Sequence, residues 1–429
     1  MNPLALLMGS FFLLVFLKVP IVFVFVISSV ITIIYMGMPL MSVINHIYSS
    51  IDSFPLLAVP FFLLLGQLLN HGRITERLIE FSDSVVGHIK GGLGHVNVLV
   101  SMLFAGLSGS SVADTAGVGA VMIPAMKKAK FDAPFSAAIT ACSSTLGGII
   151  PPSIIMVVYA SLAQLSVGAM FLSGFVPGIL IGFSQMGYTY YLAGKKGYPA
   201  GRRKDLKDMG KAFVKAFLPL LMPLIIIGGV LAGIFTATEA AVIAVAYGMI
   251  LIYAVYRSAR LRDLPKVLGT AVIGYSLPMM AVASAGIMGW LIAYLDAPDI
   301  VLRLIFNITV EPFGIALLIV AFLLILGTFL SPIICIIVFL PILQALGQAA
   351  GLDPLHLGII VVLTLSLGRV TPPYGICLLV ASQIAEIPSH KVFKASLPMI
   401  ALTLLIIVAG IVVPDLFLIL PRLLMPQYL

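Results

Sequence analysis

The chain has 429 residues, of which 61% are hydrophobic and 9% are charged, and its mean hydropathy is +1.19. Because a soluble domain carries roughly 25% charged residues, this composition excludes a soluble protein and predicts many helices that lie in lipid. The net charge of +8 would fit a nucleic-acid-binding protein, but the placement of the basic residues argues against that class. Cys142, Cys335 and Cys377 all lie in apolar runs, which predicts packing rather than a disulfide or a metal site.

Apolar stretches of about 20 residues, long enough to cross a membrane, recur along the whole chain. The first has no basic region before it, so we interpret it as a membrane helix and not as a cleaved signal. We predict ten spanning helices, at residues 3–17, 19–36, 54–70, 133–165, 167–193, 216–234, 237–256, 270–294, 356–387 and 395–418.

Two further pairs of apolar stretches, 91–127 and 312–347, are each interrupted by a segment that breaks helices. The interruptions are GLSGSSVAD at 106–114 and GTFLSP at 327–332. Polar tips occur at membrane depth only where protein or water covers them, so we predict two re-entrant helical hairpins. Two full crossings at each place would fit the charge pattern equally well.

Three segments are amphipathic: 73–90, 203–217 and 299–310. In the first, one helical face carries Ile74, Leu78, Phe81, Val85 and Ile89. We expect these segments to lie in the membrane interface as arms that brace a scaffold, or else to be ordinary loop helices.

Lysine and arginine residues gather on one side of this topology. That side holds 21 of the 24, in Lys18, 73–90, 127–130, 195–215, 257–266 and 391–394. Only Arg303 and Arg422 lie on the other side, and Arg369 lies within the membrane. By the positive-inside rule the basic side is cytoplasmic, which predicts that both termini face outward, into the periplasm if the membrane is a bacterial inner membrane, and explains the basic excess without nucleic acid.

The two hairpin regions belong to an internal repeat. TLGGIIPPS at 145–153 aligns with SLGRVTPPY at 366–374 at an offset of 221. The same offset pairs Gly106 with Gly327, Ser110 with Ser331, Asp132 with Asp353, Ser161 with Ser382 and Pro177 with Pro398. Between the hairpin tips and the aspartates, Pro124 aligns with Pro341 at an offset of 217. The alignment therefore has a four-residue gap before these prolines and a compensating gap after them. Because the hairpins open to opposite sides, we predict an inverted-topology repeat, which is typical of secondary transporters.

Each proline pair in mid-helix removes two backbone donors and breaks the helix. The freed carbonyl groups can coordinate a cation, and the half-helix N-termini can face an anion. We therefore predict two clusters of neutral oxygens that bind Na+; kinked helices with packing hydroxyl groups are the alternative. The first cluster comprises Ser108, Ser110, Ser111, Thr145, Gly147 and Pro151, and the second comprises Gly327, Thr328, Ser331, Ser366, Gly368, Thr371 and Pro372.

Two charged residues, Asp114 and Arg369, lie within the predicted membrane segments, where charge is costly and suggests function. A guanidinium can hold a carboxylate through two parallel hydrogen bonds, so we predict that Arg369 binds an anionic substrate. Asp114 would bind substrate hydroxyl groups or line an ion site. Alternatively, Arg369 reaches the cytoplasmic edge or pairs with Asp114, and Asp114 caps a helix. The predicted substrate site comprises Ser110, Asp114, Pro152, Ser153, Arg369 and Tyr374.

Other chemistry finds less support. Glu239 follows Thr236 and Thr238, and we expect it to stabilise a helix start rather than to take part in transport. GLSG at 106–109 would fit a serine protease, but its nearest base, His95, is about 20 Å away along a helix. The six histidines show no metal spacing, and no G-x-x-x-x-G-K-[ST] loop indicates an ATP-driven pump. Duplicated hairpins suit alternating access better than a passive channel. We predict a protein that is not an enzyme.

At the hairpin tips and proline pairs, the sequence resembles the large membrane subunit of tripartite ATP-independent periplasmic (TRAP) transporters, in the ion transporter superfamily. The resemblance covers essentially the whole chain and rests on GLSGSSVAD, TLGGIIPPS, GIFTATEAA and SLGRVTPPYG. Arg369 departs from the family pattern, in which small or apolar residues flank the second proline pair.

The resemblance implies two partners, a small four-helix membrane subunit and a periplasmic substrate-binding protein. It also implies sodium-coupled import of an organic acid, such as sialic acid or a C4-dicarboxylate, across the bacterial inner membrane, with no cofactor besides the coupling ion. A self-sufficient carrier of the same fold is the alternative.

In such an elevator-type fold a hairpin-containing domain slides against a scaffold. We accordingly divide the chain into scaffold helices and an arm (1–90), a first transport repeat (91–193), further scaffold helices and arms (194–311) and a second transport repeat (312–429).

Overall fold

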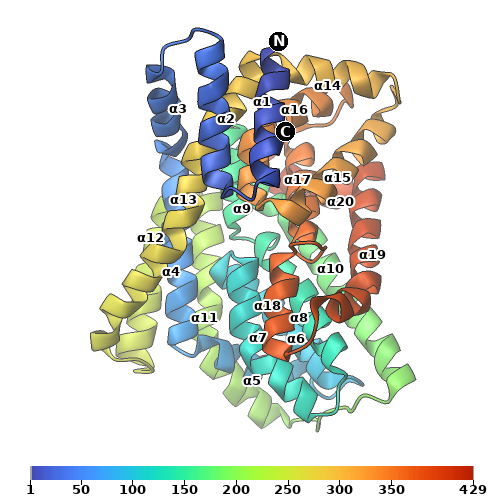
Figure 1. The fold of residues 1–429 in the computed structure, drawn as a ribbon. Helices are drawn as coiled ribbons and strands as arrows, with labels where there is room; N and C mark the ends of the chain where they lie inside the picture. Colours follow the sequence, from blue (N-terminus) through green and yellow to red (C-terminus); the bar gives the residue numbers. More distant parts are fainter. Residues whose placement is uncertain (1, 429) are drawn as a thin grey trace.

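The structure is a computed structural model that describes residues 2–428. Within that range the chain forms 20 α-helices, with short 3-10 segments and one π-helical turn, and no strand (Figure 1). Eight helical segments are long and apolar enough to cross a membrane. The prediction of an all-α polytopic membrane protein is confirmed. Residues 1 and 429, the ends of the predicted units, lie outside the described residues.

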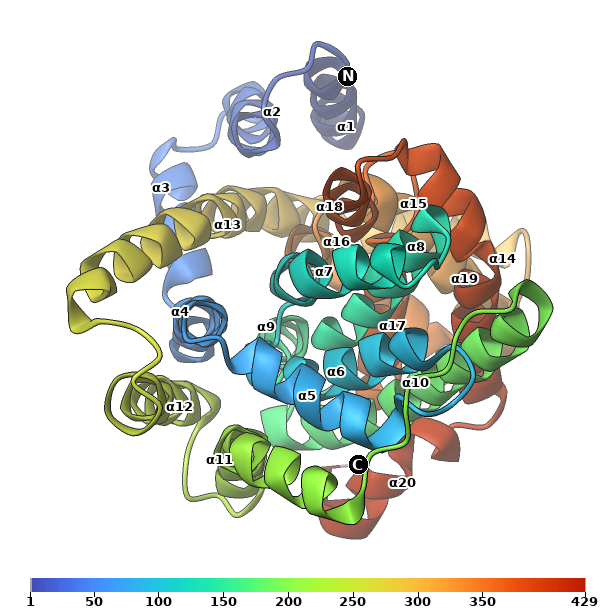
Figure 2. The same ribbon diagram turned by 90° about the horizontal axis from the view of Figure 1, so that it is seen from below.

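We distinguish a scaffold group and a hairpin group by their place in the chain. Seen from below, most scaffold helices lie to one side of the hairpin helices, whereas α14 (Ala297–Phe306) lies beside the hairpin helices and packs against one of them (Figure 2). The scaffold group consists of α1 (Pro3–Phe16), α2 (Ile21–Tyr35), α3 (Met41–Ile51), α4 (Ala58–His71), α5 (Ile74–Val86), α11 (Leu206–Leu231), α12 (Ala237–Met249), α13 (Leu264–Tyr294) and α14 (Ala297–Phe306).

The hairpin group contains both repeats. It consists of α6 (Gly92–Ser108), α7 (Ser111–Lys128), α8 (Ala133–Ser144), α9 (Ile154–Leu162), α10 (Val167–Lys196), α15 (Pro312–Phe329), α16 (Pro332–Ala349), α17 (Pro354–Gly368), α18 (Ile376–Ala385), α19 (Ser389–Val412) and α20 (Asp415–Leu424).

Both predicted hairpins form, and they enter the molecule from opposite ends. The first, α6 with α7, occupies the lower half of Figure 1, and the second, α15 with α16, the upper half. Their tips pack against the broken helices α8–α9 and α17–α18 rather than reaching the far surface. This arrangement favours re-entrant hairpins over two full crossings.

Local sequence explains why the two repeats take the same shape. Ser110 and Ser331, paired by the offset of 221, are the N-cap residues of the second helix in their hairpins, and each accepts a hydrogen bond from a backbone N–H three residues later. The proline pairs then interrupt the following helices, and both Pro–Pro peptide bonds are cis.

Several predicted bounds are wrong. Helix α3 was not expected, because its serine, asparagine and histidine residues lower its hydropathy. The arm at 203–217 and the span at 216–234 form one continuous helix, α11, since its lysines interrupt the apolar pattern but not the helix. The predicted helix 395–418 ends at Val412, and α20 begins separately at Asp415.

The first two helices differ from the prediction in depth. With 14 and 15 residues, α1 and α2 are about 21–23 Å long, shorter than the roughly 30 Å of a bilayer core. Val15, Val19 and Pro20 line a cavity that the two hairpin tips also line, and Figure 1 shows the lower ends of both helices near the middle of the molecule. The connection between α1 and α2 thus lies at the level of the hairpin tips, and it does not reach the end of the molecule where the basic segments 73–90 and 195–215 meet.

The predicted arm at 73–90 is α5, and its apolar face is buried at Ile74 and Leu78. Two ion pairs join this region to the chain around α11: Lys204 with Asp83 at 2.6 Å and Lys215 with Glu80 at 2.9 Å. The basic segments 73–90 and 195–215 thus meet at one end of the molecule, as the topology required.

Candidate functional site

The tip of the first hairpin is docked into the first helix break. Gly109 has a φ of +61°, which suits glycine, and its carbonyl oxygen accepts a hydrogen bond from the backbone N–H of Ile154 at 3.3 Å. A Cβ atom placed on Gly109 would lie 2.7 Å from the carbonyl oxygen of Pro152. Only glycine allows this approach.

Polar groups of the first predicted cluster converge behind that tip. The hydroxyl group of Ser108 donates to Asp114, and the Ser111 hydroxyl donates to the carbonyl oxygen of Thr145 at 3.4 Å. A Cβ atom on Gly147 would lie 2.6 Å from Oδ2 of Asp114. Ser108, Ser111 and Asp114 are fully buried, whereas Ser110 is half-buried and lines the central cavity, so most of the first cluster is closed to solvent.

The second hairpin tip meets the second break through backbone atoms. A Cβ atom on Gly368 would lie 2.8 Å from the backbone of Gly327, and the N–H of Tyr374 donates to the carbonyl oxygen of Thr328 at 3.2 Å. The Thr371 hydroxyl donates to the carbonyl oxygen of Gly368 at 2.9 Å. Unlike the first cluster, the second is open: Ser331, Pro372 and Tyr374 are exposed.

The two helix breaks also touch each other. A Cβ atom on Gly148 would lie 2.9 Å from the hydroxyl oxygen of Ser366 and 3.2 Å from that of Ser111. The Ser366 hydroxyl has no hydrogen-bond partner among the described residues. Ser366, predicted as part of the second cluster, therefore lies at the junction of both clusters.

A central cavity of roughly 1110 Å³ separates these tips from the scaffold group. Hairpin residues line one side, and helices α1, α2, α4 and α13 line the other. Most of the wall is apolar. Its polar side chains are Gln67, Ser110, Ser331, Arg369 and Tyr374.

The structure shows where the two charged residues predicted within the membrane lie. Ser110, not Asp114, is the N-cap of α7, so the capping alternative is wrong. Arg369 lines the central cavity and does not extend to the cytoplasmic edge. No ion pair within 4.0 Å joins Asp114 and Arg369 in residues 2–428, and the hydrogen bond that Asp114 makes comes from Ser108.

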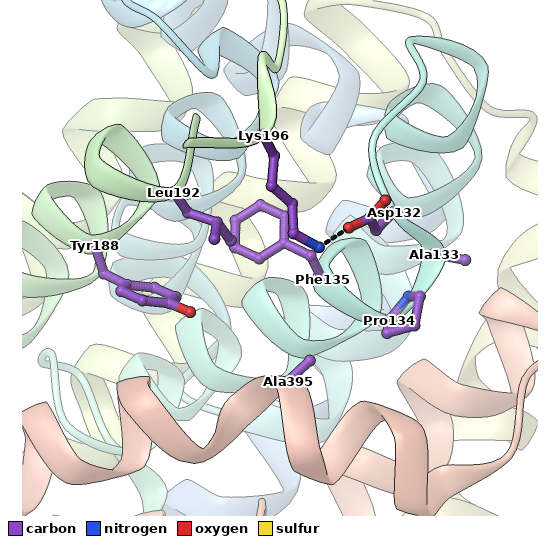
Figure 3. A pocket seen from close by; sticks show the side chains of 8 residues that line it. All are labelled: Asp132, Ala133, Pro134, Phe135, Tyr188, Leu192, Lys196 and Ala395. Atoms are coloured by element: carbon purple, nitrogen blue, oxygen red, sulfur yellow. Dashed lines mark hydrogen bonds and ion pairs between the residues drawn. The ribbon is translucent and has the colours of Figure 1, made fainter. Parts of the chain in front are cut away.

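A second, smaller cavity of roughly 500 Å³ lies away from the hairpin tips (Figure 3). Asp132 and Lys196 form an ion pair across it, and the Tyr198 hydroxyl donates to the same carboxylate at 2.9 Å. The hydrogen bond from Lys196 lowers the pKa of Asp132 below its usual value. The ion pair links Lys196 of α10 to Asp132 at the start of α8. Because both charges are paired, we interpret these residues as structural.

Glu239 and His95 both make local hydrogen bonds near the ends of their helices. Thr236 and Glu239 form a reciprocal capping box at the start of α12, which confirms the structural interpretation of Glu239. The ring of His95 bonds to the carbonyl oxygen of Lys90 at the far end of α6 from Ser108. No group of three or more metal-ligating side chains occurs within the described part of the chain.

The structure thus brings together most residues predicted from sequence. Pro152 contacts the first tip, and Ser153 caps α9 while its hydroxyl donates to the carbonyl oxygen of Gly148 at 2.7 Å. Sequence reasoning missed Gly109 and Gln67. A lone polar residue within an apolar helix was the available signal for Gln67.

Comparison with known proteins identifies this architecture. Residues 8–416 match the family of the DctM component of tripartite ATP-independent periplasmic transporters. The chain belongs to this family. The resemblance seen at the hairpin tips and proline pairs of this TRAP permease subunit is therefore confirmed.

Curated relatives of this TRAP subunit include two large permeases. The sialic acid TRAP transporter large permease SiaM of Vibrio cholerae is 36% identical, over 88% of this chain and 89% of its own length. The C4-dicarboxylate TRAP transporter large permease DctM of Pseudomonas aeruginosa is also 36% identical, over 88% of each chain. Among solved structures, MtrF of Neisseria gonorrhoeae shares the fold, with a TM-score of 0.54 and 14% identity over 89% of this chain and 83% of that chain.

Proposed function

We propose that this TRAP large permease subunit imports an organic acid across the bacterial inner membrane, coupled to Na+. The supporting observation is the meeting of two hairpin tips with two oppositely oriented helix breaks beside one cavity that contains an arginine. Inverted repeats place ion and substrate sites at such interrupted helices. The neutral oxygens of the two clusters suit Na+, a hard cation, without a fixed carboxylate.

The partners follow from the tripartite character of the family. We propose a small membrane subunit of four helices and a periplasmic binding protein that delivers the solute. The positive-inside rule supports a periplasmic location for both termini, which lie in the same half of the molecule (Figure 1). Names of relatives point to sialic acid and C4-dicarboxylates as the first solutes to test.

Transport by the reconstituted complex tests this function. The chain would be purified with its small membrane subunit, placed in proteoliposomes under an inward Na+ gradient, and supplied with labelled sialic acid or succinate, with and without the binding protein. We expect uptake that requires both Na+ and the binding protein, with a Hill coefficient for Na+ above one because two clusters are proposed.

Two results would contradict parts of the proposal. Uptake that needs Na+ but no binding protein would indicate a self-sufficient carrier of the same fold. A Hill coefficient near one would argue against two cooperating cation sites.

A further inference from the structure

The central cavity carries a single formal charge. Of the described residues that line it, only Arg369 is ionised, and Asp114 is not part of the wall. The Nε atom of Arg369 has no hydrogen-bond partner, and no ion pair neutralises its guanidinium in residues 2–428. The cavity therefore offers one site for one anionic group.

The repeat shows that this charge is specific to one half of the molecule. At the offset of 221, Arg369 corresponds to Gly148 and Tyr374 to Ser153. In the first repeat, Ser153 bonds to the Gly148 carbonyl oxygen and both residues are buried. In the second repeat, Arg369 and Tyr374 line the cavity, and Tyr374 is 59% exposed. The second break thus carries two ligand-binding groups that the closed first break lacks.

The other residues that line the cavity are mostly apolar and would contact hydrocarbon groups of a solute. Phe12 and Phe329, both more than half exposed, line the cavity with aliphatic residues of α2, α13 and α16. A solute with many hydroxyl groups would leave buried polar groups unpaired, at about 1–3 kcal/mol each. A second carboxylate would find no second cationic side chain, and an unpaired buried charge is strongly unfavourable.

We propose that the central cavity binds an organic acid with one carboxylate and a largely apolar body. Arg369 holds the carboxylate through parallel hydrogen bonds, and Tyr374 with the two phenylalanines contacts the body. The volume of roughly 1110 Å³ accommodates a ring or a branched chain. This inference rests on the proposed function, because it names the solute class of the same permease, and it differs from the solutes named for the two relatives.

Cysteine protection measures this binding without transport. Gln67 is exposed on α4 and lines the cavity, whereas Cys142, Cys335 and Cys377 are buried, so Gln67→Cys supplies the accessible thiol. Ser49→Cys, exposed on α3 and outside the cavity wall, is the matched control. The complex with the small subunit would be labelled by maleimide in Na+, in the presence of phenylacetate, phenylacetamide, succinate or N-acetylneuraminate.

We expect saturating phenylacetate to slow labelling of Gln67→Cys by roughly tenfold, with no effect at Ser49→Cys. Phenylacetamide, which has the same shape without the charge, should not protect. Adding Arg369→Ala should remove protection, while Arg369→Lys should retain part of it because a lysine still provides a positive charge.

Three outcomes would overturn the inference. Equal protection by phenylacetamide would indicate that the cavity binds apolar molecules without using the charge of Arg369. Stronger protection by succinate or N-acetylneuraminate would indicate that the cavity binds a dicarboxylate or a polar solute instead. No protection by any acid would indicate that lipid or the small subunit fills the space. Na+- and binding-protein-dependent uptake of succinate alongside any of these results would leave the proposed function standing.

Discussion

Asp132 and Asp353 occupy equivalent positions in the two repeats, each directly before the helix that leads to a proline pair. Asp353 caps its helix by accepting a hydrogen bond from the N–H of Leu355 at 2.8 Å. Asp132 makes no such cap and instead binds Lys196 and the hydroxyl group of Tyr198. One repeat uses the carboxylate to begin a helix, and the other uses it to join two helices.

The ion pair of Asp132 should stabilise the protein in a pH-dependent way. Because the folded state lowers the pKa of Asp132 through Lys196, the stabilisation is present above the unfolded-state pKa of about 3.9 and is lost as pH falls through the lower folded-state pKa. The side chains are 44% and 47% exposed, so the contribution is about 1 kcal/mol or less. Asp132→Asn should slightly lower the thermal unfolding midpoint in detergent at neutral pH, and the difference should shrink as the pH falls below about 3.9.

Asp208→Asn is the control, because Asp208 is exposed and lies 3.8 Å from Lys211. It should leave the midpoint unchanged throughout the pH range. A deficit of Asp132→Asn that persists unchanged under acid conditions would show that the carboxylate charge is not the stabilising feature.

At the scale of elements, the docking of hairpin tips into helix breaks depends on glycine. Gly109 and Gly197 both have positive φ, +61° and +69°. They differ in surroundings: a Cβ atom on Gly109 would lie 2.7 Å from the Pro152 carbonyl oxygen, and one on Gly197 would have no neighbour within 4 Å. Substitutions at these two glycines therefore distinguish the effect of a positive φ from the effect of a close contact with a neighbouring atom.

Gly109→Ala should therefore impair transport far more than Gly197→Ala. Both changes place a side chain in the left-handed region, at about 1–2 kcal/mol, but only the first also forces the tip away from the break. We expect Na+-driven uptake to fall by roughly tenfold or more for Gly109→Ala, with the complex still assembled by gel filtration. Equal uptake by the two variants would show that transport does not require the close contact between Gly109 and Pro152.

Local signals made these elements predictable from sequence. The Gly/Ser interruptions and the proline pairs locate both hairpins and both breaks within a few residues, and Ser110 and Ser331 fix where the second hairpin helices begin. The contact between Gly148 and Ser366 could not be predicted, because it depends on how two segments more than 200 residues apart pack. The greater exposure of the second cluster could not be predicted either, because it depends on the same long-range packing.

In the whole molecule, the scaffold and hairpin groups pack closely, above all α13 against α16 and α5 against α6, and two contacts near the centre of this interface involve polar side chains. The hydroxyl groups of Ser53, before α4, and Ser161, on α9, lie 3.0 Å apart. A Cβ atom on Gly117 of α7 would lie 2.3 Å from Oδ1 of Asn70 on α4. If the hairpin group slides as in an elevator, these contacts must separate in every transport cycle.

Cross-linking tests that movement. Ser53→Cys with Ser161→Cys should form a disulfide upon oxidation, since both sites are partly exposed and adjacent, and uptake should stop and return upon reduction. Ser101→Cys with Ser143→Cys joins α6 to α8 within the hairpin group only, because the two serine hydroxyl oxygens lie 2.9 Å apart. Oxidation of this buried pair by a membrane-permeant oxidant should leave uptake nearly unchanged. The three native cysteines are buried, which limits competing disulfides. Complete cross-linking of the first pair with undiminished uptake would mean that the two groups transport solute without moving past each other, and the elevator would have to be replaced by a gating motion of the hairpins alone.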